Sequence, residues 1–154
     1  MAIGHGWDIH RLVAGRKFLL GGVEIPHPTG PLGHSDGDVL LHAVIDAILG
    51  ASGQGDIGSH FPDTDEKIKG ISSRKMLAKV LELLRNRWKI VNIDVTVITE
   101  APKISPHREA IRARVAELTG CSHVNIKAKT KEGLGPVGAR EAIECHAVVE
   151  LQPA

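Results

Sequence analysis

Residues 39–50 read VLLHAVIDAILG, and a helix formed by this stretch would have almost no polar face. Asp36 or Asp38, just before it, can cap the helix N-terminus. Such a helix must be buried nearly all round, so the rest of the chain has to enclose it with other elements. His42 is a polar residue in the middle of this stretch, and burying an imidazole without a partner costs roughly a few kcal/mol. We therefore expect His42 to have a partner.

Strand patterns lie on both sides of this helix in the sequence. Gly21-Gly22 tolerates the positive φ of a two-residue turn, and residues 90–98 alternate β-branched with polar side chains. Strands are expected at residues 2–10, 17–20, 23–25, 90–98, 124–129 and 142–151.

Two more helices are expected, one from Ser72 or Ser73 to about residue 87 and one from about Pro106 to Thr119, where Gly120 can end it. The pattern predicts an α/β fold, an α+β sandwich. Its one mainly four-stranded sheet would carry helices on one face, beside a small N-terminal hairpin. Polar residues such as Glu144 would lie on the other face, where they could line a channel in a symmetric oligomer.

Length and charge limit the function classes. A chain of 154 residues fits one domain, residues 1–154, and the polar stretch 59–70 reads as a loop within it. Nineteen basic and 18 acidic residues give no broad attraction to nucleic acid or to an anionic membrane. No apolar run reaches the roughly 20 residues of a membrane span.

Only two cysteines occur, Cys121 and Cys145, without the spacing of a disulfide framework. They indicate a reducing compartment, although a bridge between them stays open. We expect a cytoplasmic location, or a plastid location if a transit peptide has been removed.

Asp8 and His10 form a two-ligand arm, because residues two apart in a strand point to the same side. With His42 they supply one carboxylate and two imidazoles, a set that suits Zn²⁺ and leaves a fourth position for a substrate oxygen. Asp46, one turn after His42, can accept a hydrogen bond from the other imidazole nitrogen. The same residues also fit Asp8 in a turn, His10 at the surface and His42 bonded to a backbone carbonyl.

Other polar segments lie where ligands collect. Residues 33–38 precede the buried helix, and a helix N-terminus favours phosphate. Residues 101–107 and 129–132 each follow a strand, as ligand-binding residues do in open α/β sheets. Taken singly, each segment also fits a capping loop or a solvated turn. Residues 55–58 and 61–65 read alone as a surface connection.

Taken in order, these segments resemble the 2-C-methyl-D-erythritol 2,4-cyclodiphosphate synthase family from residue 3 to about residue 150. The matching pieces are GHGWDIH at 4–10, HSDGD at 34–38 with His42 and Asp46, GDIG at 55–58, FPDTD at 61–65, APK at 101–103 and the segment 127–132. The resemblance implies a metal-dependent phosphorus–oxygen lyase of the non-mevalonate isoprenoid pathway. Such an enzyme closes a cyclic 2,4-diphosphate and releases CMP.

The resemblance also implies roles for single residues. Zinc would be bound by Asp8, His10 and His42, and a second ion, Mg²⁺ or Mn²⁺, by Glu132. His34 and Thr130 would stabilise the transition state. The erythritol phosphate part of the substrate would contact Ser35, Asp56, Gly58, Phe61, Pro62, Asp63, Thr64 and Asp65. The cytidine diphosphate end would contact Ala101, Pro102, Lys103, Ile104, Ser105, Lys129 and Thr130 of the neighbouring subunit in a homotrimer. The substrate would also contact Asp8, His10, His34, Ile57, Lys131 and Glu132.

The chain departs from the family pattern at two places. Lys129 and Lys131 flank Thr130 where the family commonly has a run of threonines, so a lysine can contact phosphate there. The C-terminal region reads Gly138-Ala139-Arg140-Glu141, with the arginine one position later than in the usual Gly-Arg-Gly-Glu.

Two other functions stay compatible with the residues. A zinc-dependent phosphoester hydrolase could use the open metal position to activate water, although no His-Glu-x-x-His helix is present. A non-catalytic, zinc-stabilised interaction module is the other. Structural zinc sites usually have four ligands rich in cysteine, and neither cysteine lies near the ligand set in the sequence.

Overall fold

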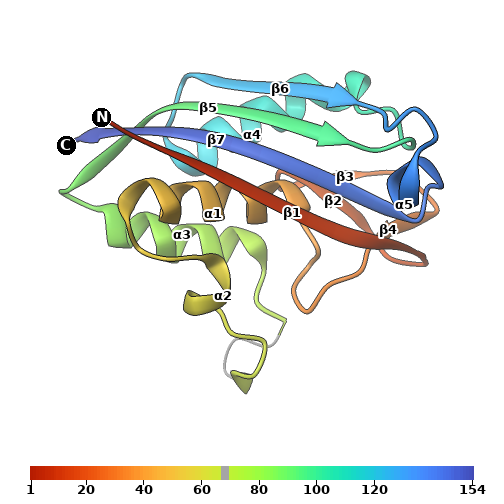
Figure 1. Ribbon diagram of the computed structural model, residues 1–154, viewed down its shortest axis with the longest axis horizontal. Coiled ribbons are helices and arrows are strands. Elements are labelled where there is room, and N and C mark those ends of the chain that lie inside the picture. The colour runs from red at the N-terminus through yellow and green to blue at the C-terminus, as the bar shows by residue number, and fades with distance from the viewer. Residues whose placement is uncertain (67–69) are drawn as a thin grey trace.

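The computed structural model describes residues 1–66 and 70–154 (Figure 1). The strands are β1 (Ala2–Ala14), β2 (Phe18–Leu20), β3 (Val23–Ile25), β4 (Thr29–Pro31), β5 (Trp88–Ile98), β6 (Val124–Lys129) and β7 (Ala142–Pro153). The helices are α1 (Val39–Ser52), α2 (Ile57–His60), α3 (Ser73–Leu84), the 3-10 turn η2 (Ser105–His107), α4 (Arg108–Thr119) and α5 (Gly135–Gly138). Part of the loop expected at 59–70, residues 67–69, lies outside the described residues.

The main sheet has five strands in the order β4-β1-β7-β5-β6, and β2 pairs with β3 as a separate hairpin. Neighbouring strands are antiparallel except β5 and β6, which are parallel. The four long strands, the hairpin and the helices confirm the predicted fold class. The prediction did not include the short edge strand β4, because Gly30 and Pro31 give this segment little strand propensity.

Helix ends follow the capping residues. Asp38 caps α1, which ends at Ser52, two residues later than expected, and Gly53 follows in the left-handed conformation (φ 70°). Ser72 caps α3 as expected, but this helix ends at Leu84 because Asn86 has a positive φ of 65° and turns the chain into β5. The structure also contains two short helices that the sequence pattern did not predict, α2 and α5.

Helix α1 lies directly on strand β1 (Figure 1). A Cβ atom at Gly4 would lie 2.0 Å from the carbonyl oxygen of Ala47, and one at Gly6 would lie 1.9 Å from that of Ala43. Only glycine permits this approach of two backbones. The next inward-facing residues of β1 after Gly6 are Asp8 and His10, so the close packing brings them toward the turn of α1 that carries His42.

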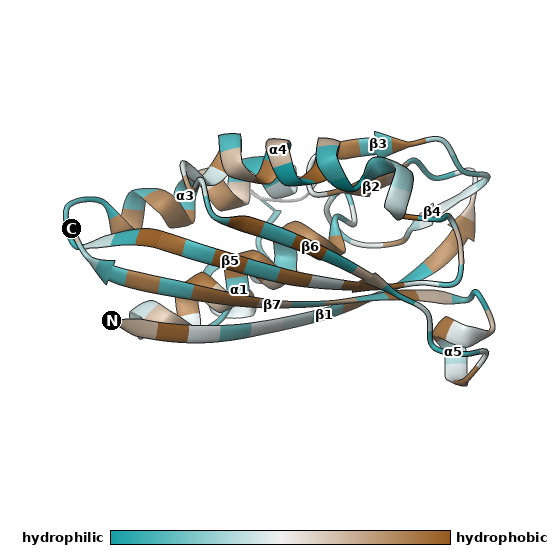
Figure 2. Cartoon of the chain, turned by 90° about the horizontal axis from the view of Figure 1, so that it is seen from above, coloured by the Kyte–Doolittle hydropathy of each residue, from teal (hydrophilic) through white to brown (hydrophobic). Residues whose placement is uncertain are grey.

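The two faces of the sheet differ in polarity. Along β7, residues 143, 145, 147, 149 and 151 are buried, and Figure 2 shows the alternation of hydrophobic and hydrophilic residues along the strands. Helix α1 packs on β1 and β7, α4 packs on β6, and α3 contacts both helices. Figure 2 shows α3 and α4 on the same side of the sheet. The opposite face carries exposed or partly exposed residues that include Trp7 and His146.

Among the described residues, no helix combines the length and the apolar character needed to cross a membrane. Cys121 and Cys145 are both buried and both free thiols, so the bridge that the sequence left open does not form.

Candidate metal centre and active site

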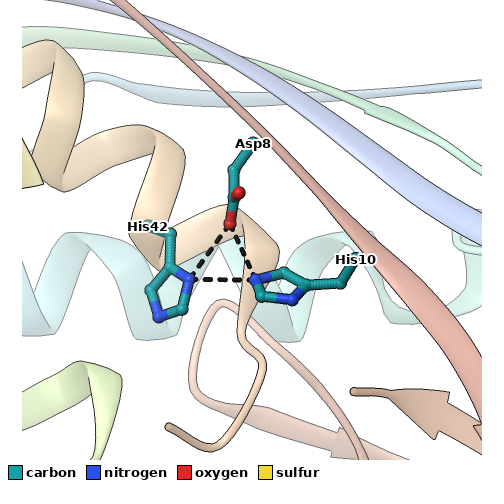
Figure 3. Close-up of side chains that lie close together, drawn as sticks. All are labelled: Asp8, His10 and His42. Atoms are coloured by element: carbon teal, nitrogen blue, oxygen red, sulfur yellow. Dashed lines mark hydrogen bonds and ion pairs between the residues drawn. The ribbon is translucent and has the colours of Figure 1, made fainter. Parts of the chain in front are cut away.

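Three ligand atoms converge where β1 meets α1 (Figure 3). Asp8 Oδ2 lies 2.9 Å from His10 Nε2 and 3.0 Å from His42 Nδ1, and the two nitrogens are 3.1 Å apart. Within residues 1–66 and 70–154, this is the group of histidine, cysteine and carboxylate ligands that lie close enough together to hold a metal ion, and it has three members. The arrangement can hold a metal ion while leaving part of its coordination to another molecule.

Both histidines are oriented through their second ring nitrogens. His10 Nδ1 lies 2.7 Å from the carbonyl oxygen of Leu32, so this nitrogen donates and Nε2 is left to face Asp8. His42 Nε2 contacts the hydroxyl oxygens of Ser73 at 2.8 Å and Ser35 at 3.0 Å. His42 therefore has the buried partners that the sequence led us to expect: Ser35 and Ser73 at Nε2, and Asp8 at Nδ1.

Asp46 is not the partner of His42, which corrects the expectation from the sequence. Its Oδ1 instead accepts a hydrogen bond from the backbone amide of Ile57 at 3.0 Å. The i,i+4 spacing places the two side chains on one side of α1. However, Nε2 of His42 points to the start of α3, and Asp46 lies beside the segment that opens α2. Asp46 therefore helps to position residues 56–58.

The electrostatics of the triad favour a cation. Burial opposes the ionisation of Asp8, but hydrogen bonds and charge interactions with His10 and His42 outweigh it and lower the pKa of Asp8 to about 2. Burial likewise opposes protonation of His10, and the hydrogen bond and negative charge of Asp8 outweigh it and raise the pKa of His10. The carboxylate is thus kept ionised at the point where the three ligand atoms meet.

The triad lines a cavity of about 880 Å³. Many of the residues expected to bind substrate also line it: Asp8, His10, His34, Ser35, Ile57, Gly58, Phe61, Pro62, Asp63 and Asp65. His34 is 82% exposed at the side chain, and its Nε2 lies 3.6 Å from Asp63 Oδ2. The cavity therefore has an inner polar end at the triad and a histidine at its mouth.

Asp56 and Thr64 are next to cavity-lining residues in the sequence but do not line the cavity themselves. Asp56 caps α2, where its Oδ1 accepts from the backbone amide of Ser59 at 2.8 Å and from its hydroxyl at 2.6 Å. These hydrogen bonds lower the pKa of Asp56. The role of Asp56 in this structure is to hold the turn that presents Ile57 and Gly58.

The segments 101–105 and 129–132 do not line the cavity either. Ile104 is buried in the hydrophobic core and anchors the first segment. Glu100 Oε1 accepts hydrogen bonds from the backbone amides of Lys131 at 2.8 Å and Gly133 at 3.4 Å. Between these two amides, Glu132 has a positive φ of 53°, a conformation that needs such support in a non-glycine residue.

The side chain of Lys131 reaches the sheet face turned away from the helices. Its Nζ lies 2.8 Å from Glu144 Oε2, and Glu144 also accepts from Trp7 Nε1 at 3.0 Å and contacts His146 Nε2 at 2.9 Å. Burial opposes the ionisation of Glu144, but these partners outweigh it and lower its pKa to about 2. Strands β1 and β7 thus separate the Lys131 side chain from the triad of the same chain.

Sequence reasoning missed several residues of the site. Ser73 follows the capping Ser72, and nothing in the local pattern distinguishes the roles of the two serines. Glu100 stands at the end of a strand, where a single carboxylate carries little signal. Ile71 and Met76 line the cavity, and only the packing of α3 against α1 brings them there.

Comparisons with known proteins identify the family of the chain. A family model described as the YgbB family matches residues 1–152. The chain is 57% identical, over 97% of its length and 96% of the relative's, to the 2-C-methyl-D-erythritol 2,4-cyclodiphosphate synthase of Dechloromonas aromatica strain RCB. A relative of the same name from Syntrophotalea carbinolica is 54% identical over 100% of this chain and 96% of its own.

Similar solved structures carry related names. "Structure of 2C-Methyl-D-erythritol-2,4-cyclodiphosphate Synthase (bound form CDP)" is 39% identical with a TM-score of 0.89, over 97% of this chain and 99% of that one. "IspF (Plasmodium falciparum) CDP complex" is 37% identical with a TM-score of 0.86, over 99% and 96%. The chain therefore belongs to the YgbB family, the family of 2-C-methyl-D-erythritol 2,4-cyclodiphosphate synthases.

Proposed function

We propose that this chain converts 4-diphosphocytidyl-2-C-methyl-D-erythritol 2-phosphate to 2-C-methyl-D-erythritol 2,4-cyclodiphosphate and CMP, in the non-mevalonate isoprenoid pathway. The observation that carries the proposal is the three-ligand triad at the inner end of a cavity, in a chain of this family. Three protein ligands leave room for a substrate oxygen, as catalytic metal sites do. The CDP named in two similar solved structures supports a cytidine diphosphate substrate.

Zn²⁺ fits the triad by ligand type and by spacing. One carboxylate oxygen and two imidazole nitrogens are ligands that zinc accepts. Bonds of about 2.0–2.1 Å in tetrahedral geometry require ligand atoms about 3.3 Å apart. The three observed separations, 2.9, 3.0 and 3.1 Å, are close to this value. When bound, zinc and a second divalent ion would polarise the phosphoryl oxygens and offset the repulsion between the two phosphates.

The residues of the chain would then position an intramolecular reaction. An oxygen of the 2-phosphate attacks the β-phosphorus, and the bond from that phosphorus to the oxygen bridging to the CMP phosphate breaks. CMP leaves with the bridging oxygen, so no water is consumed. The attacking phosphate is already ionised at neutral pH, so the site needs no strong general base. The main tasks of the protein are orientation and charge stabilisation.

Residues around the cavity would share these tasks. The amides and side chains of 56–58 and 61–65 would hold the erythritol phosphate, with Asp46 fixing the amide of Ile57. His34 stands exposed at the cavity mouth, where it can donate to a phosphoryl oxygen. If the segments 56–58 and 61–65 were only surface connections, there would be no reason for most of their residues to line the same cavity as the triad.

A homotrimer would complete the site. Thr130 and Glu132 stand on an exposed loop with Lys131, whose side chain reaches the outer face of the sheet, so a neighbouring copy is needed to bring them to the cavity. Glu132 would be the protein ligand of the second ion, Mg²⁺ or Mn²⁺. These ions typically take one or two carboxylates, with waters and substrate phosphates as the other ligands. The segment 101–105 and Lys129 would hold the cytidine diphosphate end.

The decisive experiment is incubation of the metal-loaded protein with the proposed substrate in ¹⁸O-water, followed by phosphorus NMR and mass spectrometry. We expect the cyclic diphosphate and CMP in equal amounts, without ¹⁸O in either. Inorganic phosphate, or the uncyclised 2,4-bisphosphate together with CMP and with ¹⁸O in one of the two, would establish the hydrolase instead. Absence of any reaction, together with unfolding on zinc removal, would favour the interaction module.

A cytoplasmic location belongs to the same proposal. It is supported by the two buried free thiols, which suit a reducing compartment. Separate fractions of the source cells probed with an antibody would test it.

A further inference from the structure

We propose that Asp36 and Ser73 act as a positioning pair that fixes the tautomer of His42 and aims its Nδ1 at the metal. The inference deepens the proposed function and rests on its zinc site. The contacts are a chain of three groups. Ser73 Oγ is hydrogen-bonded to Asp36 Oδ1, and His42 Nε2 lies 2.8 Å from Ser73 Oγ.

The direction of these hydrogen bonds follows from the donors available. A carboxylate offers only acceptors, so the single hydroxyl hydrogen of Ser73 must point to Asp36. The oxygen of Ser73 is then left to accept, so Nε2 of His42 must carry a proton and donate it. When a metal ion is bound at the triad, a neutral imidazole protonated at Nε2 would offer it the lone pair of Nδ1, in place of the hydrogen bond from Nδ1 to the Asp8 carboxylate. That atom is the one that lies 3.0 Å from Asp8 Oδ2 and 3.1 Å from His10 Nε2.

The position of Ser73 has no other evident purpose for its hydroxyl. The N-cap of α3 is Ser72, whose side chain accepts from the amide of Lys75, so Ser73 is not needed as the cap. Ser73 is nevertheless fully buried. Asp36 accepts two hydrogen bonds from Ser73, because its Oδ2 also accepts from the Ser73 backbone amide at 3.0 Å. The pair therefore couples the start of α3 to the orientation of a ligand on α1.

Ser35 is a weaker candidate for the same role. Its Oγ lies 3.0 Å from His42 Nε2, but its own hydroxyl hydrogen has no carboxylate partner among the contacts of the described residues. Ser35 thus can either donate or accept, and it does not select one tautomer.

Ser73→Ala tests the pair, with Ser72→Ala as the matched control on the neighbouring residue. We expect Ser73→Ala to weaken zinc binding by about 10- to 100-fold, the usual effect of losing a group that orients a metal-binding histidine. Ser72→Ala removes the helix cap and should lower thermal stability without changing zinc affinity. Zinc dissociation constants would be measured by competition with a chromophoric chelator, at a temperature where circular dichroism shows every variant folded.

A second variant and a spectroscopic measurement distinguish loss of the positioning pair from a general loss of structure in Ser73→Ala. Asp36→Asn keeps one acceptor for Ser73 and should weaken zinc binding in the same direction but less. In ¹⁵N-labelled, zinc-loaded protein, the His42 Nε2 proton should be observable and slow to exchange, and Ser73→Ala should make it exchange faster. Equal zinc affinity in Ser73→Ala and Ser72→Ala, or an unchanged exchange rate, would overturn the pair. Failure of the unmodified protein to bind zinc would instead refute the proposed metal site.

Discussion

The triad and the segment 129–133 are organised in opposite ways. Asp8, His10 and His42 project from a long strand and a largely buried helix, and their ligand atoms already lie about 3 Å apart. Thr130 and Glu132 stand on an exposed turn that depends on Glu100, and the Lys131 side chain beside them reaches the other face of the sheet. Core packing thus builds one half of the proposed site within a single chain. In the proposed homotrimer, the other half would function where a second copy meets it.

We expect the largest loss of activity from removing a ligand of the triad, the half of the site that core packing builds. Replacing His42 with alanine removes a metal ligand, and we expect turnover to fall on the order of 10³-fold or more, as when a main charge-stabilising group is lost. Steady-state kinetics and metal analysis would measure it. The control is His123→Ala, a change at an exposed histidine outside the cavity, which should leave both unchanged. Full turnover in His42→Ala would exclude the triad from catalysis.

A smaller loss of activity is expected from destabilising the turn that carries Glu132. Glu100→Ala frees the amides of Lys131 and Gly133, so the turn that carries Glu132 loses its support. We expect kcat/KM to fall roughly 10- to 100-fold through misplacement of the turn, with zinc affinity at the triad unchanged.

Glu100→Gln sharpens this comparison, because the amide side chain keeps a carbonyl acceptor for the two backbone amides. It should recover most of the activity lost in Glu100→Ala. Weakened zinc binding in either variant would mean that the two halves are not independent within one chain.

The smallest effect concerns the stability of the outer face. The pKa of Glu144 is about 2 in the folded state against an ordinary 4.5, so folding favours its ionised form. Its contribution to stability is present above about pH 4.5 and is lost as the pH falls toward 2. Glu144→Gln should therefore lower the free energy of unfolding at neutral pH, and the difference from the unmodified protein should shrink across this window.

Glu150→Gln is the matched control on the same strand, since Glu150 accepts from the neutral side chain of Gln152. Denaturant titrations at several pH values would measure both variants. A difference for Glu144→Gln that stays constant from pH 7 to about 2 would contradict the assigned role of its charge.

The same contrast explains how far the sequence could predict the molecule. The apolar run of α1, the glycines at 21–22 and the alternation along β5 and β7 predicted the architecture, because burial dictates residue type, all round for α1 and on one face for the strands. Asp8 and His10 could be paired from their spacing, and His42 from its apolar surroundings. The fold and the triad could therefore be predicted from the sequence alone.

Other features depend on packing that leaves no local pattern. Asp46 satisfied the i,i+4 rule for a partner of His42, but the ring turns toward Ser73, which comes from another helix. Glu100 is recognisable only once β5 and β6 lie side by side. Strand β4 forms in spite of its glycine and proline, because β1 extends beyond α1 and offers a free edge at Leu12–Ala14.

Mixing two inactive chains tests the shared site most directly. His42→Ala and Glu132→Ala would be produced together with different tags, and mixed oligomers would be isolated through both tags. In the proposed homotrimer each site would need an intact triad from one copy and an intact Glu132 from its neighbour. Every trimer that contains both variants would then have one complete site of three, so the isolated mixed oligomers should restore about a third of the activity of the unmodified protein. Mixed oligomers that are no more active than the two separate variants would contradict a site shared between copies.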